Sequence, residues 1–493
     1  MSSEASVMSA EYAGKRQRVG GDGLAAAVLN PAETSATSST DLESMLKQAL
    51  GRIGSLERQH GEMKTSMERE TKALRDDIET LKSKNKVLEW SLRRLASKAQ
   101  EGWEYPVAIQ PDEYWQKKGY DDEAIFNLQD RFLEGLKDTV SELEHGVCQS
   151  IQVRFVDHDE DLMPHWNALF RSFEHINPYG EGVALLIESI ELDEEIMRGI
   201  CHHIRYKNIS QVCFEDIGFT TLQAAFRELG NALKSPKLKC LDWSQNPIHN
   251  TDDMSLFMRI LSQSDVVEEL FFNGNGNDNA QALLSGVDFS TYKLLDFSGN
   301  DLQTNGGTDI PDLIAANASL KSLNLHGNRL NDDDAVMIAQ SLGGNTNLRR
   351  LYVEDNNIQE RGMRALYEAV NNTSTLNELS DSNHSCFLQG LSDKFDLEWI
   401  NNQDGPNGLY ENRMCKIHKL MAERYRNGGG NVPHLNLEMS GENAVLLAPF
   451  LMESVVRRHD AFLKSYDESS ACSLGLLYEL VKDWKMAELF SFR

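Results

Sequence analysis

The chain has 493 residues, with 76 acidic against 49 basic side chains and a net charge of −27 at neutral pH. Residues 1–40 carry a net charge of −1 and residues 41–100 a net charge of +3, so residues 101–493 carry −29. Binding to a phosphate backbone depends on Lys and Arg, and a membrane span needs about 18 apolar residues in a row, which the chain lacks. We therefore expect neither nucleic acid nor a membrane as a partner.

Residues 1–40 are rich in Ser, Ala, Gly and Thr, which predicts a disordered N-terminal tail. The segment "KRQR", Lys15 to Arg18, has the form of a short basic nuclear-import signal. The N-terminus has no apolar signal run, and the seven cysteines are scattered singly, which indicates a reducing compartment. We expect a cytoplasmic protein, with the nucleus as the alternative if the basic segment acts in import.

Residues 41–100 show a heptad pattern, in which apolar residues alternate spacings of three and four and predict a coiled coil. Its more regular half supplies the expected dimerisation residues: Ile78, Leu81, Asn85, Leu88, Leu92 and Leu95. Asn85 falls at an a position, where a buried polar residue fixes the register of parallel dimers. Lys84 and Glu89 occupy g and the following e position with opposite charges. The pattern therefore predicts a parallel homodimer.

Residues 101–150 are expected to form a linker followed by a capping helix. Pro106, Pro111 and several aromatic residues indicate the linker up to residue 121. Apolar residues at helical spacing then predict the capping helix: Ile125, Leu128, Phe132, Leu136 and Val140.

Residues 151–400 contain an internal repeat, which is most regular in five segments. These are "LKCLDWSQNPI" from Leu238, "VEELFFNGNGN" from Val267, "YKLLDFSGNDL" from Tyr292, "LKSLNLHGNRL" from Leu320 and "LRRLYVEDNNI" from Leu348. Each has an asparagine at its ninth place: Asn246, Asn275, Asn300, Asn328 and Asn356. Weaker copies begin at Ile187, Ile209 and Leu376, and from Ile209 to Leu376 the starts lie 25 to 29 residues apart. Such a constant period indicates a repeat architecture.

Each of these segments is followed by a stretch with helical periodicity, so one repeat is predicted to be a short strand, a turn and a helix. A single unit cannot bury its apolar side, and neighbouring units are expected to stack around a shared core. The ninth-place asparagine lies where the chain leaves the strand. Its amide can donate and accept hydrogen bonds, so we expect it to satisfy backbone groups of the bend.

The segment "LRRLYVEDNNIQERGMRALYEAVNNTST" resembles the leucine-rich repeat family, in its ribonuclease-inhibitor-like class with a repeat of 28 residues. The resemblance covers roughly residues 151–400. It implies an α/β fold, a right-handed solenoid shaped like a horseshoe, with a concave parallel sheet and convex helices. The coiled coil would precede this solenoid and a helical region would follow it.

The residues between the inward-facing leucines are expected on the concave face, because side chains alternate along a strand. The middle ones are Glu191, Cys213, Asp242, Phe271, Asp296, Asn324, Tyr352 and Ser380. The candidate partner-binding residues are Asp242, Phe271, Asp296, His326, Arg350, Tyr352 and Glu354. Aromatic anchors within an acidic field suit a protein segment that carries Lys or Arg.

Beyond Ile400 the repeat ends, and residues 401–493 are expected to form a helical C-terminal cap or domain, the cap being preferred. No phosphate-binding, zinc-protease or nucleophile-elbow motif is present, so we expect no catalytic residues and no cofactor. "CHH" at Cys201 to His203 lacks the second cluster that a zinc site needs. "DHDEDLMPH" at Asp157 to His165 is expected to open a helix rather than bind calcium.

Two classes of function remain. The first is a non-enzymatic interaction scaffold or adaptor, dimerised by the coiled coil and binding a protein on the concave face. The alternative is a GTPase-activating protein-like regulator, because one family that acts on a nuclear small GTPase uses this repeat class. That family carries a long acidic tail, whereas this chain ends in "ELFSFR". The interaction scaffold is the preferred reading.

Overall fold

The computed structural model describes residues 102–156, 159–397, 399–402 and 408–427, scattered residues between 64 and 99, and His434. The chain divides into two compact units, Met1–Glu89 and Trp90–Arg493. The predicted N-terminal tail with Lys15 to Arg18, and the predicted helices after residue 427, lie outside the described residues apart from His434. No helix in the described ranges combines the length and apolar character that crossing a membrane requires.

The described residues of the predicted coiled coil are all helical. Ile78, Leu81, Asn85 and Leu88 belong to the first unit, and Leu92 and Leu95 to the second. The five apolar side chains among these six are 50–66% exposed: Ile78, Leu81, Leu88, Leu92 and Leu95. The described residues of the predicted dimer interface are therefore helical, and their apolar side chains are exposed in the single chain.

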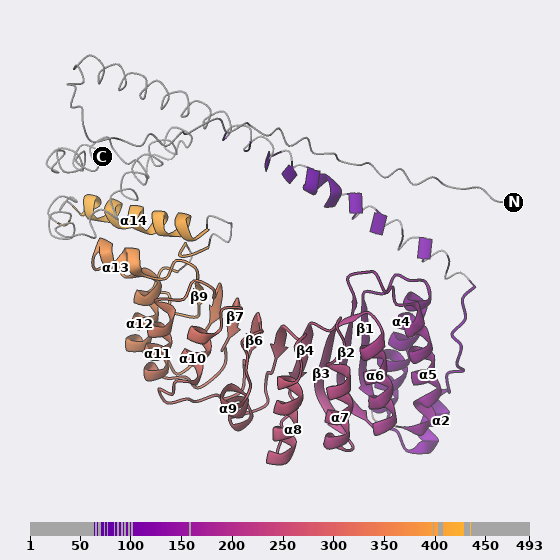
Figure 1. Cartoon of the computed structure of the whole chain (residues 1–493). Helices are drawn as coiled ribbons and strands as arrows, with labels where there is room; N and C mark the ends of the chain where they lie inside the picture. The colour runs from indigo at the N-terminus through magenta and orange to yellow at the C-terminus, as the bar shows by residue number, and fades with distance from the viewer. Residues whose placement is uncertain are drawn as a thin grey trace, which may run out of the picture. The chain divides into compact units, whose positions relative to one another are not determined.

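The second unit is built on one parallel sheet, in which the described strands lie side by side in chain order from β1 to β9 (Figure 1). The strands are β1 (Ser150–Val156), β2 (Val183–Leu192), β3 (Ile209–Phe219), β4 (Cys240–Ser244), β5 (Glu269–Phe271), β6 (Leu294–Asp296), β7 (Ser322–Asn324), β8 (Arg350–Tyr352) and β9 (Phe387–Gln389). Parallel strands need a crossover between them, and each crossover here contains a helix. This is the predicted alternation of strand and helix.

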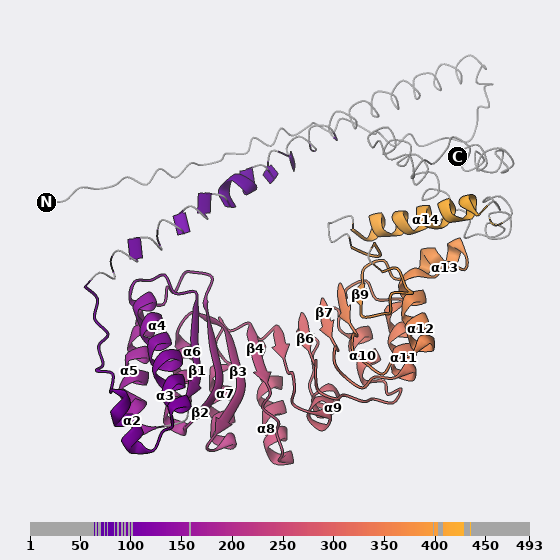
Figure 2. The same cartoon turned by 180° about the vertical axis from the view of Figure 1, so that it is seen from behind.

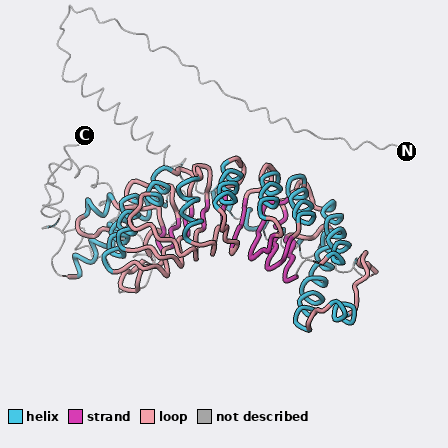
Figure 3. The backbone as a smooth tube through the Cα atoms, turned by 90° about the horizontal axis from the view of Figure 1, so that it is seen from below, coloured by secondary structure: helices cyan, strands magenta, loops and turns pink. Residues whose placement is uncertain are grey.

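The crossover helices cover one face of the sheet, which Figure 2 shows from behind and Figure 3 from below. They are η2 (Glu160–Leu162), α5 (Met163–Ser172), η3 (Phe173–His175), α6 (Glu194–Tyr206), α7 (Leu222–Ala232), α8 (Thr251–Ser262), α9 (Asn277–Gly286), α10 (Asp309–Ala316), α11 (Asp332–Leu342), α12 (Glu360–Asn371) and α13 (Leu376–Asp381). In Figure 3 the strands line the inner side of the repeats and the helices the outer side. The continuous apolar core lies between the two layers.

The asparagines of the repeat form the predicted bridges between neighbouring turns. Asn300 Oδ1 accepts a hydrogen bond from the backbone N–H of Asn275 at 2.7 Å, and Asn300 Nδ2 donates to the carbonyl of Phe272 at 2.6 Å. Asn246, Asn275, Asn328 and Asn356 each likewise accept from and donate to the backbone of the preceding repeat. Buried backbone groups at the bend are thereby satisfied, as expected from the sequence.

In eight repeats, the residue before the bridging asparagine, or before the residue that takes its place, adopts a left-handed backbone conformation. The eight residues are Phe155, Ser189, Asp216, Gln245, Gly274, Gly299, Gly327 and Asp355. The residue that follows each of them is called the ladder position, and these are Val156, Ile190, Ile217, Asn246, Asn275, Asn300, Asn328 and Asn356. The same bend therefore recurs in eight repeats, although the ladder position is aliphatic in the first three.

The strand positions predicted from the periodicity are wrong at both ends of the repeat region. At the N-terminal end, β2 begins at Val183, and Leu186 rather than Glu191 is the residue aligned with Cys213. At the C-terminal end, Leu376 begins helix α13, so Ser380 is not a strand residue. The ninth strand is β9, and Gln389 is the partner of Tyr352. An additional helix between α12 and β9 lengthens the last repeat and breaks the period.

Residues 102–121 differ from the expected linker, because they pack as part of an N-terminal cap. The cap contains α2 (Asp112–Lys118), α3 (Asp122–Phe126), the π-helix η1 (Asn127–Leu133) and α4 (Glu134–Glu144). Trp115 of α2 is buried, and Lys118 forms ion pairs with Asp159 at 2.6 Å and Asp161 at 2.7 Å. The acidic run that contains these aspartates opens η2 and α5, as predicted.

Helix α14 (Gly408–Arg426) packs on the last repeat through a buried lysine. Lys416 is 1% exposed, and its ammonium donates to the carbonyls of Val370 and Asn383 and to His384 Nδ1. His384 Nε2 in turn donates to the Ser380 carbonyl at 3.0 Å, which leaves Nδ1 as an acceptor. Burial lowers the pKa of His384 to about 3 and that of Lys416 to about 7. The three donors of the ammonium thus meet three acceptors.

Candidate functional site

The inner face of the sheet carries side chains in rows that cross the strands. Strand pairing aligns one middle row: Gln152, Leu186, Cys213, Asp242, Phe271, Asp296, Asn324, Tyr352 and Gln389. In the short strands the central leucine is buried against the helices and its two neighbours are partly exposed on the other face. The rows therefore belong to the face that the helices leave open.

The structure brings four of the seven predicted binding residues into this middle row. Asp242, Phe271, Asp296 and Tyr352 lie on β4, β5, β6 and β8, and Asn324 of β7 fills the place between the last two. Phe271 and Tyr352 are half-buried. Along this line a carboxylate, a ring, a carboxylate, an amide and a ring therefore follow one another.

The other three predicted residues lie beside this row. Arg350 begins β8 and is exposed, in register with Ser322 and the half-buried Phe387. His326 and Glu354 follow Asn324 and Tyr352 by two residues, and His326 Nδ1 lies 3.7 Å from the Glu354 carboxylate. All seven residues are thus near neighbours on β4 to β8 or directly after these strands.

Asp242 is electrostatically the most unusual of these residues. Burial, with smaller contributions from the nearby Glu215 and Asp296, raises the pKa of its carboxyl to about 6. Hydrogen bonds from Ser244 and Cys213 act in the opposite direction and lower the pKa. A carboxylate with this pKa keeps its charge at neutral pH and attracts a cation in a partly desolvated place.

Both carboxylate oxygens of Asp296 already accept a hydrogen bond within the chain. Its Oδ1 accepts the backbone N–H of Ser298 at 2.9 Å, and its Oδ2 accepts Asn324 Nδ2 at 2.8 Å. The two hydrogen bonds fix the orientation of the carboxylate. The residue therefore contributes a fixed negative charge and only part of its hydrogen-bonding capacity.

Further charged residues of this face escaped the sequence analysis. Glu188 of β2 is in register with Glu215 of β3, and Arg154 of β1 pairs with Glu188 at 2.7 Å. Gln245 donates to Glu215 at 2.9 Å. The copy that begins at Ile187 places the register of β2 too late, because Leu186 and not Glu191 aligns with Cys213, so Glu188 was not recognised as a residue of this face. The signal that indicates the earlier strand start is the continuous apolar run "VALLI" before it.

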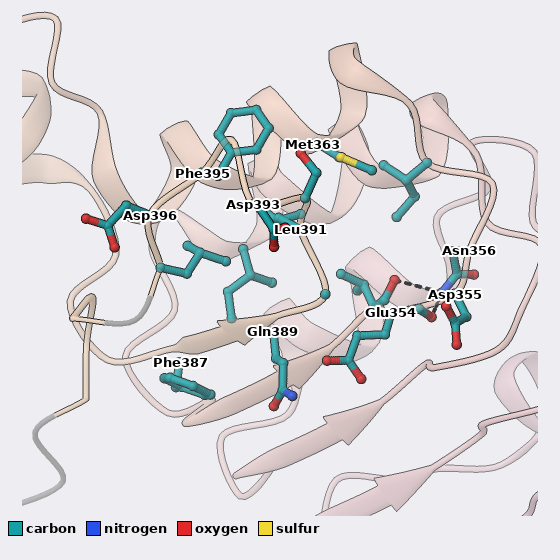
Figure 4. A pocket seen from close by; sticks show the side chains of 16 residues that line it. Glu354, Asp355, Asn356, Met363, Phe387, Gln389, Leu391, Asp393, Phe395 and Asp396 are labelled. Atoms are coloured by element: carbon teal, nitrogen blue, oxygen red, sulfur yellow. Dashed lines mark hydrogen bonds between the residues drawn. The ribbon is translucent and has the colours of Figure 1, made fainter.

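A cavity of about 890 Å³ lies at the β9 end of this face (Figure 4). Phe387, Gln389 and Glu354 continue the rows into it, and the loop after β9 supplies Asp393 and Asp396. Figure 4 shows Asp396 on the opposite side of the cavity from Glu354 and Asp355. Four carboxylates thus surround the cavity, while Leu388, Leu391 and Met363 supply apolar wall.

Gly390 shapes this cavity by letting the chain pass directly over the preceding strand. Its φ is +107°, and a Cβ atom at this position would clash with the backbone nitrogen of Glu354. Only glycine meets both the conformational and the steric requirement. Sequence reasoning could not find the cavity, because one of its walls is the loop after β9, whose sequence does not follow the repeat pattern.

The "CHH" segment lies on helix α6. In the described part of the chain, no group of three or more His, Cys, Asp or Glu side chains could hold a metal ion. Cys201 is buried, and the His203 ring packs between Phe170 and Phe173. Burial lowers the pKa of His203 to about 4. The "CHH" segment is accordingly part of the packing between α5 and α6.

Comparison with known proteins bears on the repeat. A family model described as "Leucine Rich repeat" matches residues 316–339 and 344–366. Similar solved structures include actin-binding site 2 of leiomodin-1, which is 13% identical, with 41% of this chain and 92% of that chain covered and a TM-score of 0.22. An internalin (InlF) from Listeria monocytogenes is 12% identical, with 46% and 67% covered and a TM-score of 0.27. A search of curated proteins finds no match. The two matched segments are leucine-rich repeats, and the nine-stranded fold that contains them is a leucine-rich-repeat solenoid.

Proposed function

We propose that this protein is a non-enzymatic interaction scaffold or adaptor, which binds a basic segment of a protein partner on its concave face. It dimerises through its coiled coil. The observation that carries the proposal is the register of Asp242, Phe271, Asp296 and Tyr352 in one row. Leucine-rich repeats generally serve as interaction modules, and the acidic face favours a partner with Lys or Arg.

The dimensions of the row suit a short peptide segment. From β4 to β8 the row crosses four strand spacings, or about 19 Å. An extended chain of about six residues has this length. Half-buried rings flanked by carboxylates would hold the stems and cationic ends of its side chains, while partial exposure of Phe271 and Tyr352 leaves apolar surface to cover.

The proposal of a dimer rests on the heptad pattern and on the exposed side chains at those positions. Leucine and isoleucine residues that remain 50–66% exposed on helical positions are favourable to bury against a second copy. Lys84 and Glu89 would pair between the helices of a parallel dimer. Two concave faces in one dimer would raise the avidity for a partner with repeated segments.

The binding proposal is tested with an array of 12-residue peptides that contain Lys or Arg, followed by affinity measurement for the best binder. The double variant Phe271→Ala, Tyr352→Ala should weaken that affinity by about 2 kcal/mol, roughly 30-fold, which is the scale of an interface hot spot. Tyr206→Ala is the matched control, because Tyr206 is an exposed ring on helix α6. Unchanged affinity of the double variant would exclude the concave face as the binding site.

The dimer is tested by sedimentation of the full-length chain at tens of micromolar, roughly the range in which marginal coiled coils still pair. The parent should sediment as a dimer, and Leu88→Lys should make it a monomer. Asn85→Leu should raise the stability of the assembly and broaden its range of oligomers. A monomeric parent would contradict the proposal.

The alternative of a GTPase-activating protein is tested on a panel of small GTPases. We expect no stimulation, since no catalytic group is identified. Rate enhancement above about a hundredfold, the low end of what one positioned catalytic group supplies, would favour the alternative.

A further inference from the structure

A second cavity lies at the opposite end of the concave face, where the sheet begins. It has a volume of about 530 Å³ and is bounded by η1, α4 and β1. Ser150, Gln152 and Arg154 of β1 line it, and strand pairing makes each of them the first residue of one row across the sheet. All three rows of the concave face therefore start in this cavity.

Arg131 of η1 is the notable cation of the cavity. Its guanidinium lies over the Phe155 ring at 4.8 Å and over the Phe126 ring at 5.5 Å. Within the described ranges no carboxylate forms an ion pair with it. The rings contact the faces of the guanidinium plane and leave the N–H groups at its edge available. Two of these N–H groups can donate to the two oxygens of one carboxylate.

Two unusual backbone features meet at this cation. η1 is a π-helix of seven residues, and such helices are rare and frequent at functional sites. Phe155 has a φ of +59°, which is an outlier for a bulky residue. The equivalent residues of the other repeats are Gly or short polar or amide side chains. Both features lie at the Arg131–Phe155 contact: Arg131 belongs to η1, and Phe155 is the residue with positive φ.

The floor of the cavity has an unused hydroxyl. Ser150 Oγ is buried and has no hydrogen-bond partner among the described residues. This hydroxyl is five residues, or about 16 Å, along β1 from Phe155, so it lies at the opposite end of the cavity from Arg131. Gly135 of α4 leaves room for a ligand one helical turn from Arg131, because a Cβ atom there would meet nothing within 4 Å.

The far wall of the cavity has the opposite charge. Asp138 and Glu142 of α4 follow Arg131 by seven and eleven residues, so Asp138 lies about 10 Å along the helix from Arg131. Arg154 is already paired with Glu188. A dianion would meet repulsion from Asp138 and Glu142, whereas a single carboxylate at the Arg131 end would not be close to them.

We propose that the Arg131 end of this cavity is a binding site for one carboxylate, which accepts two hydrogen bonds from the Arg131 guanidinium. The carboxylate comes from a peptide, either from its C-terminus or from an acidic side chain. The peptide as its source rests on the proposed function of the concave face. The sheet then orients the partner, with its carboxylate at β1 and its basic residues toward the acidic cavity at β9. Eight strand spacings, about 38 Å, separate the ends, which is the length of about 12 extended residues.

The test uses small molecules and the full-length chain, so that it does not depend on the partner. Ligand-observed NMR titration compares N-acetylglycine, which imitates a C-terminus, with its uncharged amide at constant ionic strength. The α-amide of N-acetylglutamate imitates an acidic side chain. We expect at least one of the two carboxylates to bind in the millimolar range and the uncharged amide to bind at least tenfold more weakly. The tighter of the two identifies the source.

Two variants and one control locate the binding. Arg131→Gln should weaken carboxylate binding at least tenfold, whereas Ser150→Ala should leave it unchanged, because Ser150 lies at the other end of the cavity. Arg205→Gln is the control, since Arg205 also lies over a ring, that of Tyr206 at 5.5 Å, but on α6.

The proposal is overturned if neither carboxylate binds at 50 mM, if the amide binds equally well, or if Arg131→Gln binds like the parent. Loss of peptide binding in the Phe271 and Tyr352 variant, with carboxylate binding retained, would support both proposals as separate properties. If peptide binding is unaffected in that variant, the concave row is not the peptide-binding site. The carboxylate titration would then still support the cavity as a separate site.

Discussion

Strands β1 to β3 have seven, ten and eleven residues, whereas β5 to β8 have three each. Both groups contain the same left-handed bend. In the first group the ladder positions are aliphatic, and strand pairing continues through them, as between Ile190 and Ile217. In the second group the ladder positions are asparagines that bond to the backbone of the preceding repeat. The two groups satisfy the backbone after the bend by different means.

The comparison shows that the asparagine replaces strand pairing rather than adding to it. Where the chain remains extended after the bend, its N–H and C=O groups find the neighbouring strand, and an aliphatic side chain contributes to the core. Where the chain turns away, the same groups would be buried without partners, and a side-chain amide supplies both a donor and acceptors. The identity of the ladder residue therefore follows from the direction of the chain after it.

The largest expected effect comes from removing one asparagine of the second group. Asn300 is fully buried and bonds to the backbone of Asn275, Gly276, Phe272 and Phe297. Asn300→Ala leaves several buried backbone groups unpaired, and we expect the free energy of unfolding to fall by about 4 kcal/mol in urea denaturation. The control is Asn347→Ala, because the Asn347 side chain has no hydrogen bond within the described ranges. A loss below about 1 kcal/mol for Asn300→Ala would refute the role given to the ladder.

The converse substitution probes the first group. Ile190 is 3% exposed and pairs with Val156 and Ile217 through the backbone. Ile190→Asn buries an amide where strand pairing has already used the backbone groups, and we expect a loss of about 3 kcal/mol. Ile190→Val should cost only about 1 kcal/mol. If denaturation shows that asparagine is tolerated as well as valine, the two groups of repeats are interchangeable and the comparison fails.

In the last repeat, which belongs to neither group, the chain passes close to the Glu354 backbone because residue 390 is a glycine. Gly390→Ala introduces a Cβ atom against the Glu354 backbone at a positive φ, and we expect a loss of about 2 to 3 kcal/mol. Gly344→Ala is the control, because a Cβ atom there meets nothing within 4 Å. Thermal unfolding of both variants measures the difference. Equal stabilities would mean that the loop after β9 adapts freely.

Asp242 lies on β4, where the two groups meet, and gives the smallest expected effect. Its folded-state pKa of about 6 lies above the ordinary value of 3.8, so the protonated form stabilises the fold and this contribution is lost as pH rises from about 4 to 6. Asp242→Asn should therefore match the parent at pH 4 and exceed its stability by about 1 to 2 kcal/mol at pH 8. Chemical denaturation at both pH values checks this. A constant difference between parent and variant would show that the carboxyl titrates normally.

The sequence predicted the repeated part of the molecule well and the places where repetition stops poorly. The five asparagines and the row from Asp242 to Tyr352 follow from a local pattern that each repeat restates. Glu191 and Ser380 were misplaced, because the first strands are longer and the last repeat contains α13. Neither cavity could be predicted, since each lies between a terminal strand and a segment of unrelated sequence. Contacts of that kind depend on tertiary packing and leave no periodic signal.

The buried ammonium of Lys416 has a consequence for the kinetics of the C-terminal end. A small acylating reagent reaches this amine only after α14 separates from the last repeat, whereas Lys394 is exposed on the loop after β9. If separation is fast and reversible, the ratio of the two modification rates equals the fraction of time that the end is open. Acylation of Lys416, read by mass spectrometry, thus measures fraying of the solenoid end in the natural sequence, without any introduced label.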